Sequence, residues 1–232
     1  MLPRTGKVAL ISAFLVLSFL LSAAISLSCG AGGMDFAGLR AVLSGNADES
    51  ARLIIEQIRL PRLAAGIIAG ASLSLAGGAM QSLFRNPLAD PSILGVSSGA
   101  ALGAVLAMTV FAGAFATEIC ALFGGLTAAF AVYKLGAFGG RASAFSTLLA
   151  GIAVNAFCGA IVGFFMYSAR DVGLRGYVFW SLGSLDRCGW PDILAAAAAA
   201  VPSWIAILLC ARPLNLMLLG SCLLYTSDAA DE

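Results

Sequence analysis

The segment LAAGIIAGASLSLAGGAMQSLFRNPLADPSILGVSSGAALGAVLAM, residues 63–108, decides the fold. Its two apolar parts, 63–84 and 92–108, flank a polar turn that contains Pro87 and Pro91. Apolar runs of about this length are typical of membrane-spanning helices, and the prolines prevent one helix from continuing into the next. The segment therefore predicts two membrane helices joined by a short turn.

The whole chain has the composition of a membrane protein. Of its 232 residues, 60% are hydrophobic and 11% are charged, whereas a soluble domain has about 25% charged residues. The net charge of +1 gives no basic patch for nucleic acid, and the absence of histidine removes the commonest metal ligand and general base. The six scattered cysteines are read as small apolar core residues. We therefore expect an all-α, polytopic transmembrane helix bundle that is not an enzyme and binds no metal or cofactor directly.

Six apolar runs divide the chain. The predicted spans are about 8–29, 63–84, 92–108, 111–133, 144–167 and 191–210. Before the second span lies a polar interval, 30–62, and Pro61 is expected to stop a helix from running directly into the span. Residues 168–190 are polar enough to leave the membrane and carry aromatic residues suited to its interface.

Small residues recur at every fourth position in three of these spans, and such stripes let helix backbones approach closely in a membrane. We assign a packing role to the glycines of the stripes, namely Gly66, Gly70, Gly78, Gly95, Gly99, Gly103, Gly151 and Gly159. Asn155 continues the stripe of the fifth span. Two uses are open for its amide: hydrogen bonding to another helix, or lining a polar path together with Ser97 and Ser98.

Several motifs along the chain carry a family resemblance. They are IRLPR (58–62), the NPLADP turn followed by LG and GA (86–100), STLLAGIAVNA (146–156), WSLGSL (180–185) and ARPLNLMLLG (211–220). In this order they resemble the FecCD-type permease subunits of bacterial ABC importers, which take up iron–siderophore complexes, haem and vitamin B12. The resemblance covers residues 8–220, whereas residues 221–232 do not share it and are expected to be a non-native tail.

The resemblance implies a fold, a membrane and partners. Family members have about ten spans, so six of ten would be present in this chain, truncated after about two thirds of the family length. The permease is expected in the bacterial cytoplasmic (inner) membrane as a homodimer or heterodimer with its N-terminus in the cytoplasm. A cytoplasmic ATPase dimer would use the ATP, and a periplasmic or lipid-anchored binding protein would deliver the substrate. That substrate is expected to be a metal chelate, first a ferric siderophore, with haem or vitamin B12 as alternatives.

The resemblance also implies site residues. Asn86, Pro87 and Leu88 would form the cytoplasmic gate, and the alternative is a plain turn in which Asp90 caps the following helix. The turn from Ser143 to Ser146 is a second, weaker gate candidate. Two arginines, Arg59 and Arg62, would meet carboxylates on the binding protein, or else anchor a helix at the membrane interface.

A hypothesis of another class is a structural membrane protein that transports nothing. A shared cavity lined by Asn155, Ser97 and Ser98 would favour the importer, whereas dry helix contacts of these residues would weaken it. An enzyme would need a catalytic cluster, and the sequence offers no histidine and no paired acids within a span.

Overall fold

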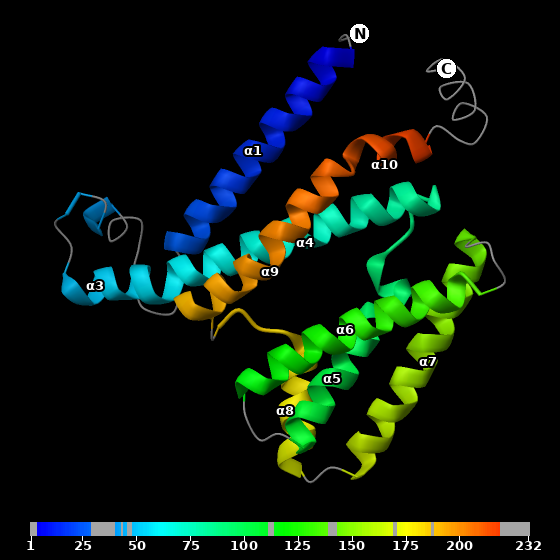
Figure 1. Cartoon of the computed structure of the whole chain (residues 1–232). Coiled ribbons are helices and arrows are strands. Elements are labelled where there is room, and N and C mark those ends of the chain that lie inside the picture. The colour runs from blue at the N-terminus through cyan, green and yellow to red at the C-terminus, as the bar shows by residue number, and fades with distance from the viewer. Residues whose placement is uncertain are drawn as a thin grey trace. The chain divides into compact units, whose positions relative to one another are not determined.

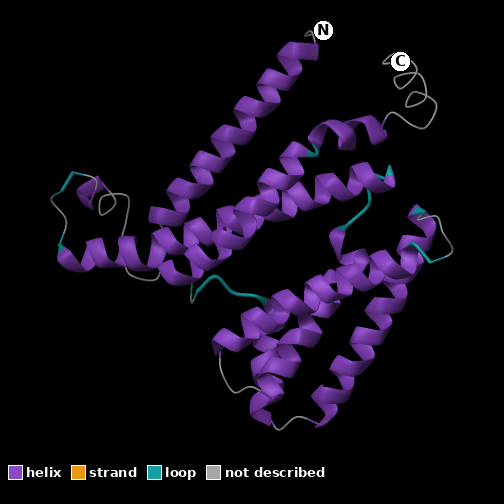
Figure 2. Cartoon of the chain, viewed as in Figure 1, coloured by secondary structure: helices purple, strands orange, loops and turns teal. Residues whose placement is uncertain are grey.

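The computed structural model describes residues 4–28, 40–42, 44–45, 48–110, 114–138, 143–168, 171–186 and 188–218. These residues form helices joined by turns (Figures 1 and 2). In chain order the elements are α1 (Arg4–Ser28), α3 (Glu49–Ile54), the π-helical turn η1 (Ile55–Arg59), α4 (Leu60–Phe84), the 3-10 turn η2 (Pro91–Leu94), α5 (Val96–Val110), α6 (Ala114–Gly136), α7 (Ala144–Ser168), α8 (Asp171–Leu182), α9 (Trp190–Leu209) and α10 (Ala211–Leu218). The all-α fold predicted from the sequence is confirmed.

The described chain divides into two compact units. Unit 1 comprises residues 1–72 and 185–203, and unit 2 comprises residues 73–184 and 204–232. Both α4 and α9 begin in unit 1 and end in unit 2. The tail predicted for residues 221–232 lies outside the described residues.

Among the described residues, five helical segments are long and apolar enough to cross a membrane: Gly6–Ser28, Glu49–Phe84, Thr117–Gly136, Ala144–Ser168 and Trp190–Leu209. They correspond to five of the six predicted spans. The third predicted span, 92–108, is a shorter apolar helix, Val96–Thr109. Its predicted start is wrong because Pro91–Leu94 form a 3-10 turn that ends at Gly95, whose φ is 77°. Glycine tolerates this left-handed conformation, and an α-helix does not continue through it.

Pro61 was expected to stop the helix, and this expectation is wrong. The elements α3, η1 and α4 form one continuous helical segment. A proline inside an α-helix clashes with the carbonyl of the residue four positions earlier. Immediately before Pro61 the helix widens into a π turn, in which the Leu60 N–H donates to the Ile55 carbonyl five residues back. The wider turn accommodates the proline without ending the helix.

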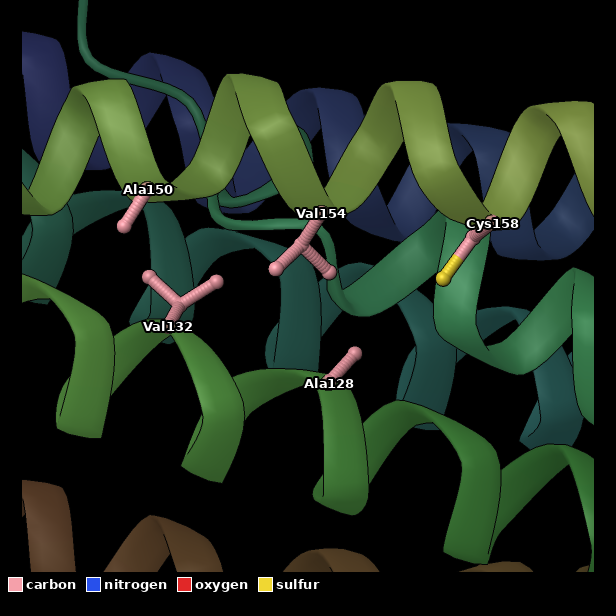
Figure 3. Close-up of a cluster of buried hydrophobic side chains, with 5 residues drawn as sticks. All are labelled: Ala128, Val132, Ala150, Val154 and Cys158. Carbon is pink, nitrogen blue, oxygen red and sulfur yellow. The ribbon is translucent and has the colours of Figure 1, made fainter.

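The core of unit 2 lies between α6 and α7 and consists of small side chains (Figure 3). Its buried members are Ala128, Val132, Ala150, Val154 and Cys158. Helix α5 also packs against α6, and its Ala104 and Ala107 are 0% exposed. Here backbones meet directly: a Cβ atom on Gly103 would overlap the Cys120 carbonyl oxygen. Three helices of unit 2 thus form a close-packed group on which the turn between α4 and α5 is mounted.

Candidate functional site

The turn between α4 and α5 begins with an unusual helix end. The Asn86 N–H donates to the Gln81 carbonyl (3.1 Å), and the Arg85 N–H donates to the Ser82 carbonyl (3.3 Å). This pair of bonds is a Schellman motif, in which glycine normally occupies the left-handed position. Arg85 stands there instead, with a φ of 50°. A non-glycine residue in this conformation is strained, so the chain leaves α4 through a turn that stores some conformational energy.

The predicted gate residues follow at once. The Asn86 side-chain oxygen accepts a hydrogen bond from the Leu88 N–H at 2.9 Å, which forms a local Asx turn. Leu88 is 85% exposed, whereas its neighbour Ala89 is 8% exposed. The turn therefore presents one large apolar side chain outward while its following residue is anchored in the protein.

Asp90 closes the turn by capping η2. Its carboxylate accepts the Ser92 N–H at 2.7 Å, as expected for a residue that precedes a helical turn. Hydrogen bonds from the Ser92 hydroxyl and from its N–H hold the pKa of the Asp90 carboxyl below its ordinary value. The capping role that the sequence offered as the alternative to a gate is thus present, and it is compatible with a gate formed by the preceding residues.

Asn155 of α7 fastens η2 from the side. Its amide nitrogen lies 3.3 Å from the carbonyl oxygens of both Ser92 and Ile93, and its side-chain oxygen accepts the Ser98 hydroxyl at 2.6 Å. The structure therefore uses the amide for contacts between helices, one of the two uses left open by the sequence. Of the three residues expected to line a path, Ser98 binds Asn155 and Ser97 is exposed, and the path itself stays a prediction.

The second gate candidate is a helix cap. The Ser143 hydroxyl accepts the Ser146 N–H (3.0 Å), and the Ser146 hydroxyl accepts the Ser143 N–H (3.1 Å). This reciprocal pair is a capping box at the start of α7. The Ser146 hydroxyl also lies 2.8 Å from the Gly136 carbonyl at the end of α6. Both side chains thus fix the connection between α6 and α7.

In unit 1, Arg59 is not placed as an exposed docking residue would be. It is 7% exposed, and its Nη1 donates to the Leu27 carbonyl at 2.5 Å. Leu27 lies in the last turn of α1, where carbonyl groups lack helical partners and a positive charge is favourable. The docking role of Arg59 stays a prediction, and the structure shows a different use for its side chain, the capping of α1.

Arg62 lies on the same helical segment and is more accessible. Its Nη2 contacts Oδ1 of Asp186 at 2.6 Å, with the two side chains 43% and 74% exposed. An ion pair this exposed contributes little to stability, so its loss costs little. Sequence reasoning missed Asp186 because nothing in the order of residues brings position 186 to position 62.

Trp190 was also missed as a structural contact. Its indole Nε1 donates to the backbone carbonyl of Glu56 at 2.9 Å, across 134 positions of sequence. Pro61 could have indicated that such a contact exists. A proline removes an N–H donor from a helix and leaves a backbone carbonyl that needs another partner.

The predicted packing glycines fall into two groups, with Gly66 between them. A Cβ atom on Gly95, Gly99, Gly103 or Gly151 would meet atoms of another element closer than ordinary contact allows. Gly66 has one looser neighbour, with Leu185 Cδ1 3.8 Å from the Cβ position. Around Gly70, Gly78 and Gly159, no described atom lies within 4 Å of that position. The stripe pattern alone did not separate these groups.

Comparison with known proteins identifies related sequences. The FecCD transport family matches residues 15–225. The hemin transport system permease protein HmuU of Yersinia pestis is 38% identical over 214 residues, which cover 89% of this chain and 64% of that protein. The cobalamin import system permease protein BtuC of Halobacterium salinarum is 40% identical over 174 residues, which cover 74% of this chain and 47% of that protein.

Two further comparisons also find transport permeases or transporters. A Helicobacter pylori protein named "Probable iron chelatin transport system permease protein" is 37% identical over 171 residues, which cover 74% of this chain and 52% of that protein. A solved structure described as "An inward-facing conformation of a putative metal-chelate type ABC transporter" superposes with a TM-score of 0.74 at 25% identity, covering 94% of this chain and 67% of that one. The chain thus spans about half to two thirds of the length of the curated relatives it matches.

Proposed function

The chain belongs to the FecCD transport family, and from this premise we propose that it is the membrane-spanning permease subunit of an ATP-driven importer in the bacterial inner membrane. The match over residues 15–225 carries the proposal. The five helices in the described part of the chain that are long and apolar enough to span a membrane are consistent with it. ATP would be hydrolysed by a separate ATPase subunit on the cytoplasmic side, where the N-terminus would also lie.

The proposed substrate is a metal chelate. The relatives are named for hemin, cobalamin and iron chelatin transport, and in each of these compounds an organic ligand encloses a metal ion. We place a ferric siderophore first, with haem and vitamin B12 as alternatives. Such a cargo is bulky and carries its own metal, so the permease needs a wide path and no metal ligands of its own.

The proposed gate is the turn that contains Asn86, Pro87 and Leu88. Its support is geometric: the Asn86 side chain fixes the backbone at Leu88, and the leucine side chain stands out at 85% exposure. With the same turn of a second permease subunit opposite, two such leucines would narrow the path at this level. For Ser143 and Ser146 the support is weaker, because their hydroxyl groups already cap α7.

The proposed partners include a second permease subunit and a binding protein that docks on the outer face. Arg62 suits docking better than Arg59, because its guanidinium is half-exposed and is paired with an exposed carboxylate. A carboxylate on the binding protein would compete with Asp186 for Arg62. Such an exchange mainly orients the partner and speeds its association, and adds little affinity.

An uptake experiment tests the function. A strain that lacks the permease gene is supplied with radiolabelled ferric siderophore, haem or vitamin B12, and the intact gene is then restored. The proposal expects at least one of these uptakes to be lost and regained. Unchanged uptake of all three chelates in the deletion strain would contradict it and would favour the structural alternative.

A further inference from the structure

One backbone carbonyl in the π turn loses its helical donor. At the end of η1 the Leu60 N–H reaches back five residues, to the Ile55 carbonyl. The next donor in this pattern would be the N–H of residue 61, and its acceptor would be the Glu56 carbonyl. Residue 61 is proline and has no N–H. The Glu56 carbonyl therefore needs a donor from elsewhere in the fold.

That donor is the indole of Trp190, 2.9 Å away at the start of α9. An indole N–H only donates, so it suits a lone carbonyl acceptor. The Glu56 side chain is engaged elsewhere, because its carboxylate accepts a hydrogen bond from Nε of Arg52 at 2.7 Å. The two groups left over by the local chemistry, a carbonyl without an N–H and an indole without an acceptor, thus satisfy each other.

The bond also fastens the chain that precedes Trp190. Along this segment Asp186 pairs with Arg62, and Leu185 lies against Gly66. Next to Trp190, the Gly189 N–H is held by the Asp192 carboxylate at 2.9 Å, which caps α9. Asp186 and Trp190 thus attach this part of the chain to the η1–α4 helix at two points.

We propose that Trp190 is a positioning residue for the Arg62–Asp186 pair: its indole replaces the N–H that Pro61 lacks and so holds the segment bearing Asp186 against α4. The use of this pair in docking rests on the proposed function, whereas the bond itself does not. In this account Pro61 creates an acceptor on the helix surface, and Trp190 is the residue that occupies it.

A simpler role for Trp190 is an aromatic anchor at the membrane interface, since tryptophan is enriched there. The two roles differ in what they require of residue 61. An anchor needs only the aromatic ring, so it holds the neighbouring segment equally well whether residue 61 is proline or not. A surrogate donor is needed only while the Glu56 carbonyl lacks an N–H within its own helix.

A cycle of four variants in lipid nanodiscs separates these roles: the parent permease, Trp190→Phe, Pro61→Ala, and the double variant. Phenylalanine keeps an aromatic ring and removes the donor. Alanine at position 61 supplies an N–H, and the Glu56 carbonyl is then paired whether the helix stays π, through residue 61, or returns to α, through Leu60. Amide hydrogen exchange of peptides covering residues 184–189 is measured on the resting permease, without ATPase or binding protein.

We expect Trp190→Phe to speed exchange in this segment roughly three- to tenfold, the range given by the net worth of one hydrogen bond. In the Pro61→Ala background the same substitution is expected to change exchange less than about twofold. Trp180→Phe, whose ring stacks on Tyr177 in α8, is the matched control and should leave residues 184–189 unchanged.

An equal effect of Trp190→Phe in both backgrounds, or no effect in the parent, would overturn the proposal. If Trp190→Phe alone fails to accumulate in membranes, accumulation restored by Pro61→Ala counts as the same rescue, and equal loss in both backgrounds counts against it. Since the measurement needs no transport, its outcome is independent of whether the chain imports a chelate.

Discussion

In unit 2, α5 and α6 meet at glycines, so that a Cβ atom on Gly103 would overlap the Cys120 carbonyl. In unit 1, three contacts between segments distant in sequence end on polar atoms: Arg59 on the Leu27 carbonyl, Arg62 on Asp186, and Trp190 on the Glu56 carbonyl. Lipid offers apolar helices no hydrophobic reason to associate, so close backbone packing and interhelical polar contacts are the available means. Unit 2 relies mainly on close backbone packing, whereas unit 1 relies more on polar contacts.

The difference bears on function. Backbone contacts at glycine tolerate little displacement, and a group of helices joined this way makes a firm base for the turn at residues 85–91. Exposed polar pairs exchange partners at small cost, which suits a surface that another protein approaches. We therefore propose that the gate lies on the glycine-packed unit and that the docking candidate lies on the unit held by polar contacts.

The largest expected effect is that of a methyl group added in unit 2. Gly103→Ala forces its Cβ atom onto the Cys120 carbonyl, and backbone cannot yield as a flexible side chain can. We expect a loss of about 2 kcal/mol or more in the free energy of unfolding, the usual cost of overpacking. Thermal unfolding of the permease in nanodiscs measures it as a lower midpoint.

Gly70→Ala and Gly159→Ala are the matched controls. No described atom lies within 4 Å of a Cβ atom built at either position. Alanine is a better helix former than glycine by about 1 kcal/mol, so these variants should be neutral or more stable. If all three substitutions destabilise equally, the division of the glycines into two groups is wrong.

The next effect contrasts two arginines three positions apart. Arg59→Gln removes a buried cation from the end of α1, and we expect a loss of about 1–3 kcal/mol because a helix carbonyl loses its donor. For Arg62→Gln, the expected loss is about 0.2–1 kcal/mol, since both members of its ion pair are largely exposed. Denaturation of the two variants side by side gives the comparison. A larger loss for Arg62→Gln would reverse the roles assigned here.

A smaller effect is expected where a polar contact occurs within unit 2. Asn155→Leu removes the hydrogen bonds to Ser98 and to the carbonyls of η2. Polar contacts between membrane helices are worth about 0.6 kcal/mol on average and up to about 1.7, so we expect a loss near 1 kcal/mol. In a double-mutant cycle with Ser98→Ala the two losses should not add. Strict additivity would show that the bond contributes nothing.

The smallest effect is a dependence on pH at Asp90. Hydrogen bonds from Ser92 lower the pKa of this carboxyl in the folded turn, so its capping is present above the ordinary pKa and is lost as the pH falls through the lowered one. A spin label on Leu88→Cys should keep constant mobility from neutral pH down to about pH 4 and become more mobile only below it. The Asp90→Asn variant should show no such transition, and a transition that persists in it would assign the effect to another group.

Sequence reasoning placed the helices well because apolar runs mark them directly. It missed the passage through Pro61 because a π turn is a cooperative adjustment of several residues that no local pattern announces. The glycine stripe illustrates the same limit. Gly70 and Gly103 obey one spacing rule, yet only the tertiary neighbours decide which of them lies against another backbone.

The candidate site was predictable as a segment and not as a set of contacts. The polar turn after α4 stood out from its composition, and the capping by Asp90 followed from residue type. The burial of Arg59 could not be read from the IRLPR motif, because it depends on where α1 ends in space. Asn155 was correctly singled out as a polar residue in an apolar helix, but its partners in η2 are about sixty positions away.

The proposed gate requires that the turn carrying Leu88 opens and closes while α5, α6 and α7 stay in place. Leu88→Cys in a background without other cysteines, in inside-out vesicles with the ATPase, is exposed to a membrane-impermeant thiol reagent with and without ATP. We expect the rate of modification at position 88 to change with the ATP state, whereas Phe138→Cys, at a similarly exposed position just after α6, should react at a constant rate. Equal rates at position 88 in every state would contradict it.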